Sequence, residues 1–289
     1  MVSICIPAYE APASLARLLN SILIQSYRDF EIIISDDTQG DSRADLVQSY
    51  TDSRIRYHHN ATPLGSPENW NYAVSLASGD FIKVMHHDDW FDSDYSLERM
   101  VLAMNEKGED FLFVQSKNMG SDGLISVNAP TSEAVNAMVI HPFSLFFKNI
   151  IGAPSATLYR KCGYRYDHNL RWFVDVEFYY SMIADGASVS YLPEQLVCVG
   201  VDGPRVTNEY LNCFPSVAEE FFYSWYKFKK DGRLSIGDSY YWLYRFLKEY
   251  QSLRWRDFLP YMRAYTAPVS IVLWAVLKFK MAVRRLKQS

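Results

Sequence analysis

The sequence is poor in cysteine and has no glycine-rich or charge-rich tract. Its 289 residues include only four cysteines and 13 glycines. Cys5, Cys162, Cys198 and Cys213 form no C-x-x-C pair, which argues against a metal finger or a disulfide scaffold and favours reduced packing residues. With 49% hydrophobic and 21% charged residues, the composition also excludes a disordered or collagen-like chain. We therefore expect a globular protein, with room for one α/β domain and an appendage.

The sequence also lacks a long apolar run. The stretch APVSIVLWAVL, which begins at Ala267, has eleven residues, whereas a spanning helix needs about 20. Near the other end, Val2–Pro7 follows Met1 with no basic leader and no small-residue cleavage site, so we expect no secretory signal. These features predict a cytoplasmic protein without a membrane-spanning segment.

Charge is distributed unevenly along the chain. The net charge is −4, but residues 245–289 carry ten Lys and Arg against two acids, a net +8, which leaves −12 for residues 1–244. An acidic body argues against nucleic acid as a partner. The basic, partly apolar tail suits the surface of an anionic membrane, here the inner face of the cell membrane, with peripheral attachment. The alternative is a helix packed on the body or on a second subunit, which allows a homodimer.

Apolar strands and amphipathic helices alternate over about the first 115 residues. The run VSICIP at 2–7 is typical of a buried strand, and from Pro12 apolar residues recur at helical spacing. Further strands are predicted at 30–35, 54–59, 81–87 and 111–116, and further helices from Pro67, with Ser66 as the N-cap, and around residues 97–104. This order predicts a Rossmann-like α/β fold with a mostly parallel sheet flanked by helices.

The second half of the chain is less regular. We expect a strand within 152–160, a helix from about Asp175 to Gly186, and more sheet at 187–199 with an interruption at Pro193. From Glu209 onward, aromatic and basic helices dominate. The expected domains are therefore residues 1–205, which bind the ligand and carry the site, and a helical C-terminal region, residues 206–289.

Two pairs of adjacent carboxylates follow predicted strands. Asp88 and Asp89 lie in HHDDW, and Asp36 and Asp37 lie in SDDTQGDS. Parallel strands end at one edge of a sheet, so both pairs should share that edge, where such folds bind ligands. Neighbouring side chains on extended chain point apart, so each acid should have its own task, such as holding a hard cation or a ribose hydroxyl. The alternative for each pair is a solvated turn.

At this point the sequence resembles the inverting glycosyltransferases of family 2, which have the GT-A fold. The segments that carry the resemblance span about the first 200 residues: VSICIPAYE (2–10), FEIIISDDTQGDS (30–42), ENWNYAVSLASGDFIKVMHHDDW (68–90) and FVDVEFYYSMIADG (173–186). The runs ENWN and GDFIKVMHHDD are most similar to those of bacterial members that assemble surface polysaccharides.

The resemblance implies a role for several residues. The loop after the first strand would hold the nucleotide base, and Asp37 matches the acid that meets the base N–H. Asp88 and Asp89 match the DXD-like element, with Asp88 near the ribose and donor sugar and Asp89 as the ligand of Mn²⁺ or Mg²⁺. His86 and His87 precede this pair without an assigned role. The residues of the base-binding loop are Pro7, Ala8, Tyr9 and Glu10.

The same resemblance implies that Asp175 is the catalytic base. The family pattern there is Glu-Asp, and this chain has Val174 before Asp175 and Glu177 two residues later. An aspartate at the start of a helix can also be a simple cap. Arg205 and Thr207 weakly match a loop that closes over the diphosphate, and a solvated turn is the alternative.

These inferences predict a metal-dependent, inverting glycosyltransferase. The donor would be a nucleoside diphosphate sugar, with uridine the expected base, and the acceptor a saccharide or lipid-linked saccharide of surface polysaccharide synthesis. One alternative is a sugar nucleotidyltransferase, although PAYEAPASLA at 7–16 lacks the glycine and lysine of a phosphate loop. Another is a non-catalytic subunit that binds nucleotide sugars.

Overall fold

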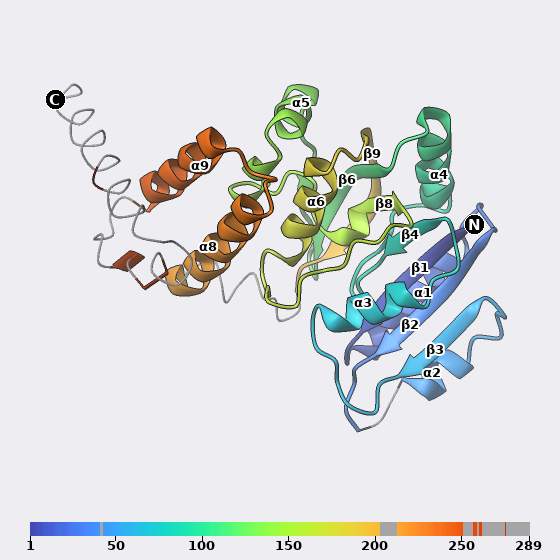
Figure 1. The fold of residues 1–289 in the computed structure, drawn as a ribbon. Coiled ribbons are helices and arrows are strands. Elements are labelled where there is room, and N and C mark those ends of the chain that lie inside the picture. Colours follow the sequence, from blue (N-terminus) through green and yellow to red (C-terminus); the bar gives the residue numbers. More distant parts are fainter. Residues whose placement is uncertain (41–42, 203–212, 251–256, 259, 262–274, 276–289) are drawn as a thin grey trace. The chain divides into compact units, whose positions relative to one another are not determined.

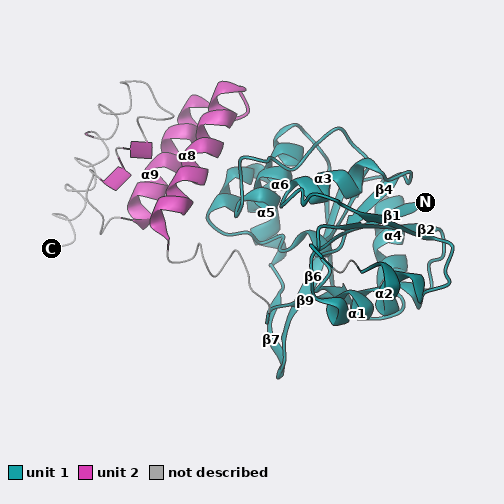
Figure 2. Ribbon diagram, turned by 90° about the horizontal axis from the view of Figure 1, so that it is seen from below, with its two compact units in different colours: residues 1–206 teal, residues 207–289 magenta. Residues whose placement is uncertain are grey.

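The computed structural model describes residues 1–40, 43–202, 213–250, 257–258, 260–261 and 275. Its contacts divide into two compact units, Met1–Val206 and Thr207–Ser289 (Figures 1 and 2). Arg205, Thr207 and almost all of the apolar and basic tail from Ala267 lie outside the described residues, so the predictions about them stay predictions.

The first unit begins with the predicted alternation of strands and helices. Its strands are β1 (Val2–Ala8), β2 (Phe30–Asp36), β3 (Ile55–His59) and β4 (Phe81–Val84). They pair in parallel in the order β3-β2-β1-β4, so the ends of β2, β1 and β4 lie at one edge of the sheet (Figure 1). The helices between them are α1 (Pro12–Leu23), α2 (Ala44–Gln48) and α3 (Glu68–Ser75).

Beyond β4 the sheet is mixed rather than parallel. It continues through β8 (Thr157–Arg160), β6 (Phe111–Gly120), β9 (Val189–Gly200) and β5 (Trp90–Phe91), and β7 (Gly123–Asn128) forms a hairpin with β6. Only β6 and β9 are parallel there, whereas β8, β5 and β7 run against their partners. The sequence did not predict β5 or β7, since one has two residues and the other exposes most of its side chains.

Helices flank the sheet on both faces (Figure 2). Apolar residues of α1, among them Leu15, Leu18 and Leu19, pack on the buried side chains of β1 and β2. The helix α4 (Ser96–Lys107) adds Met100 and Met104 to this core. On the other side lie α3 and α6 (Val174–Ala184). The remaining helices are α5 (Ser132–Ile140) and the short 3-10 helices η1 (Pro142–Phe146) and η2 (Pro154–Ala156).

Two local expectations need correction. The helix α3 is preceded by Pro67 rather than capped by Ser66, and no side chain caps it. The strand β9 is not interrupted at Pro193, because Leu192 pairs with Val114 and Gln195 pairs with Gln115. The two residues between them bulge out of the ladder, which accommodates a proline that has no N–H to donate.

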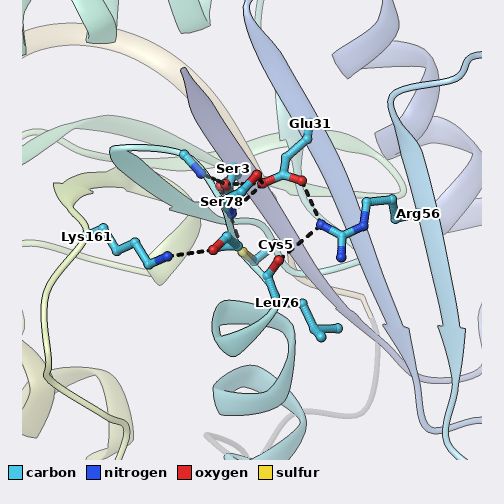
Figure 3. A network of polar contacts seen from close by, with 9 residues as sticks. Ser3, Cys5, Glu31, Arg56, Leu76, Ser78 and Lys161 are labelled. Atoms are coloured by element: carbon cyan, nitrogen blue, oxygen red, sulfur yellow. Dashed lines mark hydrogen bonds and ion pairs between the residues drawn. The ribbon is translucent and has the colours of Figure 1, made fainter.

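A polar network fastens the amino ends of the parallel strands (Figure 3). Glu31 on β2 accepts hydrogen bonds from the Ser3 and Ser78 hydroxyls, both at 2.6 Å, and forms an ion pair with Arg56 at 2.9 Å. Burial opposes ionisation of Glu31, but these bonds outweigh it and lower its pKa to about 2. Beside them, Lys161 donates to the Ala77 carbonyl at 2.7 Å. This edge is opposite the one where β2 ends at Asp36, and it stabilises the fold.

The second unit contains two described helices, α8 (Phe214–Lys230) and α9 (Ile236–Glu249). They pack through aromatic side chains, with the rings of Phe221 and Phe246 stacked at 4.0 Å. None of the helices in the described part of the chain combines the length and the hydropathy needed to cross a bilayer.

Candidate functional site

The expected base-binding residues meet where β1 and β2 end. Ala8 is the last residue of β1, and its carbonyl accepts from the Asp37 N–H at 3.0 Å. The Glu10 N–H donates to the Thr38 hydroxyl at 2.8 Å, which ties the two loops together. Tyr9 is 52% exposed between these anchors. An exposed ring on a fixed loop provides a surface on which a planar base can stack.

The loop after β1 has an unusual backbone. Glu10 and Ala11 have φ values of 49° and 43°, both in the left-handed region that residues other than glycine rarely adopt. Ala11 is also the residue before α1, which starts at Pro12. Such strain persists only where the surrounding contacts impose it, and it is concentrated at ligand-binding loops.

The first acidic pair is satisfied by donors of the protein itself. Asp36 accepts from the N–H groups of Thr38 and Arg43 and from the Tyr57 hydroxyl, and although burial opposes ionisation, these bonds lower its pKa. Asp37 is 4% exposed and accepts from Asn60 at 2.8 Å. The N–H groups at 64 and 65 also donate to Asp37. Two neighbouring carboxylates repel each other, and these hydrogen bonds offset that repulsion.

The second acidic pair lies in the turn after β4. In this turn one ligand atom each of His86, Asp88 and Asp89 lies within 4.8 Å of the others. His86 and Asp88 are half-buried, and Asp89 is 1% exposed. Two carboxylates at this spacing suit Mn²⁺ or Mg²⁺, whose coordination phosphate oxygens would complete. His87 is not part of this cluster.

This turn, residues 86–90, is held by segments far apart in the sequence. The Asp88 carbonyl accepts from Arg17 of α1 at 2.8 Å, and the Arg17 guanidinium lies 3.7 Å from the centre of the Trp90 ring. The N–H of Gly200, at the end of β9, donates to Asp89 Oδ1 at 3.1 Å. A Cβ at Gly200 would lie 2.5 Å from the Asp88 carbonyl oxygen, so only glycine fits beside the turn.

Ser155 of η2 makes the remaining contacts with the turn. Its hydroxyl donates to Asp89 Oδ2 and accepts from the His86 N–H at 3.1 Å. Its carbonyl accepts from the side-chain amine of Lys83 on β4. Burial lowers the pKa of Lys83 to about 7, and the nearby charge of Asp89 acts in the opposite direction.

Asp175 lies in the first turn of α6. Its Oδ1 accepts from the Val176 N–H at 2.8 Å, and its Oδ2 accepts from the Asn149 side chain at 3.0 Å. Burial raises the pKa of Asp175 to about 6, against the effect of these bonds. Glu177 is 2% exposed and accepts from Ser181 inside the helix. A carboxylate with a pKa near 6 is suited to accept a proton from a hydroxyl at neutral pH.

One segment connects Asp175 with the acidic turn. Asn149 contacts Asp175, and six residues later Ser155 contacts Asp89. Aromatic rings make a second connection: the Trp70 ring lies 4.5 Å from that of His86 and 5.1 Å from that of Tyr166. Tyr166 in turn stacks on Phe178 of α6 at 4.4 Å. The structure therefore links the two parts of the predicted site through residues that sequence reasoning did not single out.

Those missed residues gave little signal in the sequence. Ser155 lies in a segment, GAPSATLYR, predicted as a strand, and Gly200 follows an apolar run. Lys83 was the stronger signal, because a lysine inside the apolar run FIKVM has to be paired or to reach solvent.

The strand order and the flanking helices define an α/β fold of the GT-A type. The model of the family "Glycosyl transferase family 2" matches residues 3–163, more than half of the chain. The chain belongs to this glycosyltransferase family.

Several characterised proteins are similar to this chain. The glucosyltransferase WfgD of Escherichia coli, which acts with UDP-Glc on GlcNAc-diphosphoundecaprenol, is 27% identical over 43% of this chain and 49% of its own length. TuaG of Bacillus subtilis, a putative teichuronic acid glycosyltransferase, is 27% identical over 64% of this chain and 73% of its own. The chain thus spans about half the length of WfgD.

Solved structures of S. aureus TarS have the same fold. The complex of TarS residues 1–349 with UDP-GlcNAc superposes with a TM-score of 0.67 at 17% identity, covering 96% of this chain and 79% of that fragment. A complex of the same fragment with UDP superposes with a TM-score of 0.59 and covers 78% of this chain and 65% of the fragment. At this level of identity the likeness confirms the GT-A fold that the sequence predicted.

Proposed function

We propose that this protein is an inverting glycosyltransferase that uses a uridine diphosphate sugar and a divalent cation. The observation that carries the proposal is the connection of the acidic turn, residues 86–90, with Asp175, whose pKa is raised to about 6. WfgD uses UDP-Glc and TarS forms a complex with UDP-GlcNAc, which supports the choice of donor.

The donor would lie along the edge where β2, β1 and β4 end. The base meets the loop Pro7–Glu10, with Tyr9 as stacking surface, and Asp37 holds this pocket in shape and meets the base N–H. Asp88 meets the ribose and the donor sugar. Asp89 is a ligand of the cation, because a carboxylate that accepts two hydrogen bonds still has lone pairs for an ion. A bound Mn²⁺ or Mg²⁺ supplies charge that neutralises the leaving diphosphate.

Asp175 would act on the acceptor. It takes the proton from an acceptor hydroxyl, whose oxygen forms a bond to the anomeric carbon while the bond from that carbon to the diphosphate oxygen breaks. A single displacement inverts the configuration. Relatives named for undecaprenyl-linked and teichuronic acid substrates support a lipid-linked saccharide acceptor in surface polysaccharide synthesis.

Calorimetry with UDP, with and without Mn²⁺, tests the donor assignment. We expect UDP to bind more tightly with Mn²⁺, and Asp89→Asn, which keeps the shape of the side chain, to remove most of that gain. Asp185→Asn, at the far end of α6, is the matched control. Unchanged Mn²⁺ dependence in Asp89→Asn would refute the metal assignment, and tight binding of GDP or TDP instead would correct the base.

Slow hydrolysis of a UDP sugar by purified protein separates an enzyme from a non-catalytic subunit. We expect UDP release above the buffer rate, and none with Asp175→Asn. UDP binding without any hydrolysis or transfer, across a panel of donors and lipid-linked acceptors, would favour the non-catalytic alternative.

A further inference from the structure

Lys83 is fully buried in the middle of the sheet. It lies on β4, between β1 and β8, and has an exposed fraction of 0%. Lysine is almost never buried to this degree unless a partner compensates its charge. Its amine donates to the Ser155 carbonyl and lies 5.5 Å from the centre of the Phe91 ring. These contacts orient the amine, but neither supplies a full negative charge.

The compensating charge belongs to Asp89. Asp89 is 1% exposed, and its carboxylate contacts the same residue, Ser155, as the Lys83 amine does. Burying one charge alone is costly, whereas burying two opposite charges near each other offsets much of that cost. Lys83 and Asp89 therefore depend on each other.

Ser155 connects the two. Its carbonyl accepts from Lys83, and its hydroxyl donates to Asp89 and accepts from the His86 N–H. Ser155 is itself fully buried, so this connection is shielded from water. A displacement of the Lys83 amine would shift the Ser155 backbone and, with it, both residues of the turn.

We propose that Lys83 is a positioning residue for the cation site: acting through Ser155, it fixes the Asp89 carboxylate and the His86 backbone in the geometry that binds the ion. This inference rests on the proposed function, because it assumes that the turn binds a cation together with the donor. Lys83 touches neither ligand and is not a catalytic residue.

The test compares Lys83→Met with Lys161→Met. Both lysines donate to a main-chain carbonyl in the same unit, but the Lys161 acceptor, Ala77, belongs to the network at the opposite edge. Methionine keeps the length of the side chain and removes its charge. We expect Lys83→Met to weaken Mn²⁺ binding in the presence of UDP by roughly tenfold or more, a common effect of losing a residue that orients a metal ligand.

The same titrations distinguish positioning from packing. UDP affinity without Mn²⁺ should stay within about twofold of wild type in both variants, because the base loop is anchored to Thr38 and not to Lys83. Ser155→Ala, which removes the hydroxyl but keeps the carbonyl, should also weaken Mn²⁺ binding selectively. Equal Mn²⁺ affinities in Lys83→Met and Lys161→Met, or equal losses of UDP affinity with and without Mn²⁺ in Lys83→Met, would overturn the proposal.

If Lys83→Met does not fold, a second measurement decides. In the double variant Lys83→Met, Asp89→Asn both buried charges are gone, so the double variant should fold and unfold at higher urea than either single variant. A double variant no more stable than Lys83→Met would refute the pairing. If wild-type protein binds neither UDP nor Mn²⁺, the proposed function itself fails, and this outcome is distinct from selective failure of the lysine variant.

Discussion

Asp175 combines a high pKa with a fixed orientation. Burial accounts for the first, and the bonds from Val176 and Asn149 account for the second. A base needs both properties, because it has to bind a proton strongly enough to take it from a hydroxyl while still being ionised at neutral pH, and it has to lie within reach of the acceptor hydroxyl. A helix cap needs neither a raised pKa nor a side-chain partner on a distant segment.

Substitution of Asp175 by asparagine should separate these two roles. We expect transfer to fall by about 100-fold or more while UDP affinity with Mn²⁺ stays near wild type, because asparagine keeps the shape but cannot take the proton. Steady-state transfer rates and calorimetry on the same preparation measure both. An Asp175→Asn protein that remains active would move the base elsewhere, and Glu177→Gln would be the next variant to measure.

The raised pKa of Asp175 also predicts how activity and stability change with pH. Transfer should increase as pH rises through about 6, because only the carboxylate accepts a proton. Stability should change in the opposite sense: a carboxyl whose pKa rises from 3.8 to about 6 on folding favours the fold when protonated, and this contribution is lost as pH rises through 6.

Urea unfolding between pH 4 and 8 measures this linkage. Asp175→Asn should gain about 3 kcal/mol on wild type at pH 7.5, because the pKa rises by about two units at about 1.4 kcal/mol each, and less than about 1 kcal/mol at pH 4. A constant difference across this pH range would mean that Asp175 titrates at its ordinary value.

At the scale of elements, the end of β9 limits the space beside the acidic turn. Gly200→Ala would place a Cβ 2.5 Å from the Asp88 carbonyl oxygen, so the turn would have to move. We expect Mn²⁺-dependent UDP binding to weaken by roughly tenfold or more. Gly163→Ala is the control, since nothing lies within 4 Å of its Cβ position. Equal Mn²⁺-dependent UDP affinities in the two variants would show that the turn can move without weakening ion binding.

Hydrophobic periodicity was sufficient to predict the strands β1 to β4 and the helices α1, α3 and α4, but not the short helix α2. The runs at 2–7 and 30–35 are apolar because both faces of a central parallel strand are covered, and α1 shows one apolar face. The pattern failed where tertiary contacts decide. The strand β5 has only two residues, and β9 passes Pro193 by bulging against β6.

The residues of the candidate site also differ in how far the sequence predicts them. The sequence pointed to Asp37 and Asp89 because paired acids at strand ends form recognisable motifs, and it pointed to Asp175 through the resemblance to the family. Ser155 and Gly200 could not, since their importance depends on which strand ends beside the turn. That neighbourhood is set by the order β4-β8-β6-β9, and no local pattern encodes it.

At the scale of the molecule, the two units differ in charge. The segment 245–289 carries a net +8 and ends in a basic cluster. Deletion of residues 267–289 should release the protein from anionic vesicles, because each basic residue near such a surface contributes about 1 kcal/mol. UDP binding should be unchanged. Co-sedimentation at low and high salt measures the release. If the full-length protein does not bind anionic vesicles, the tail is instead a helix that packs on the body or on a second subunit.

The contacts that hold the acidic turn determine when this turn can form during synthesis of the chain. Strands β1 to β4 are complete by residue 84 and pair with one another in parallel. The turn, by contrast, needs Ser155 and then Gly200, so it cannot close until β9 has left the ribosome. Domains tend to fold from the N-terminus as they emerge. A nascent chain would thus form the strand ends at Ala8 and Asp36 early and complete the acidic turn last.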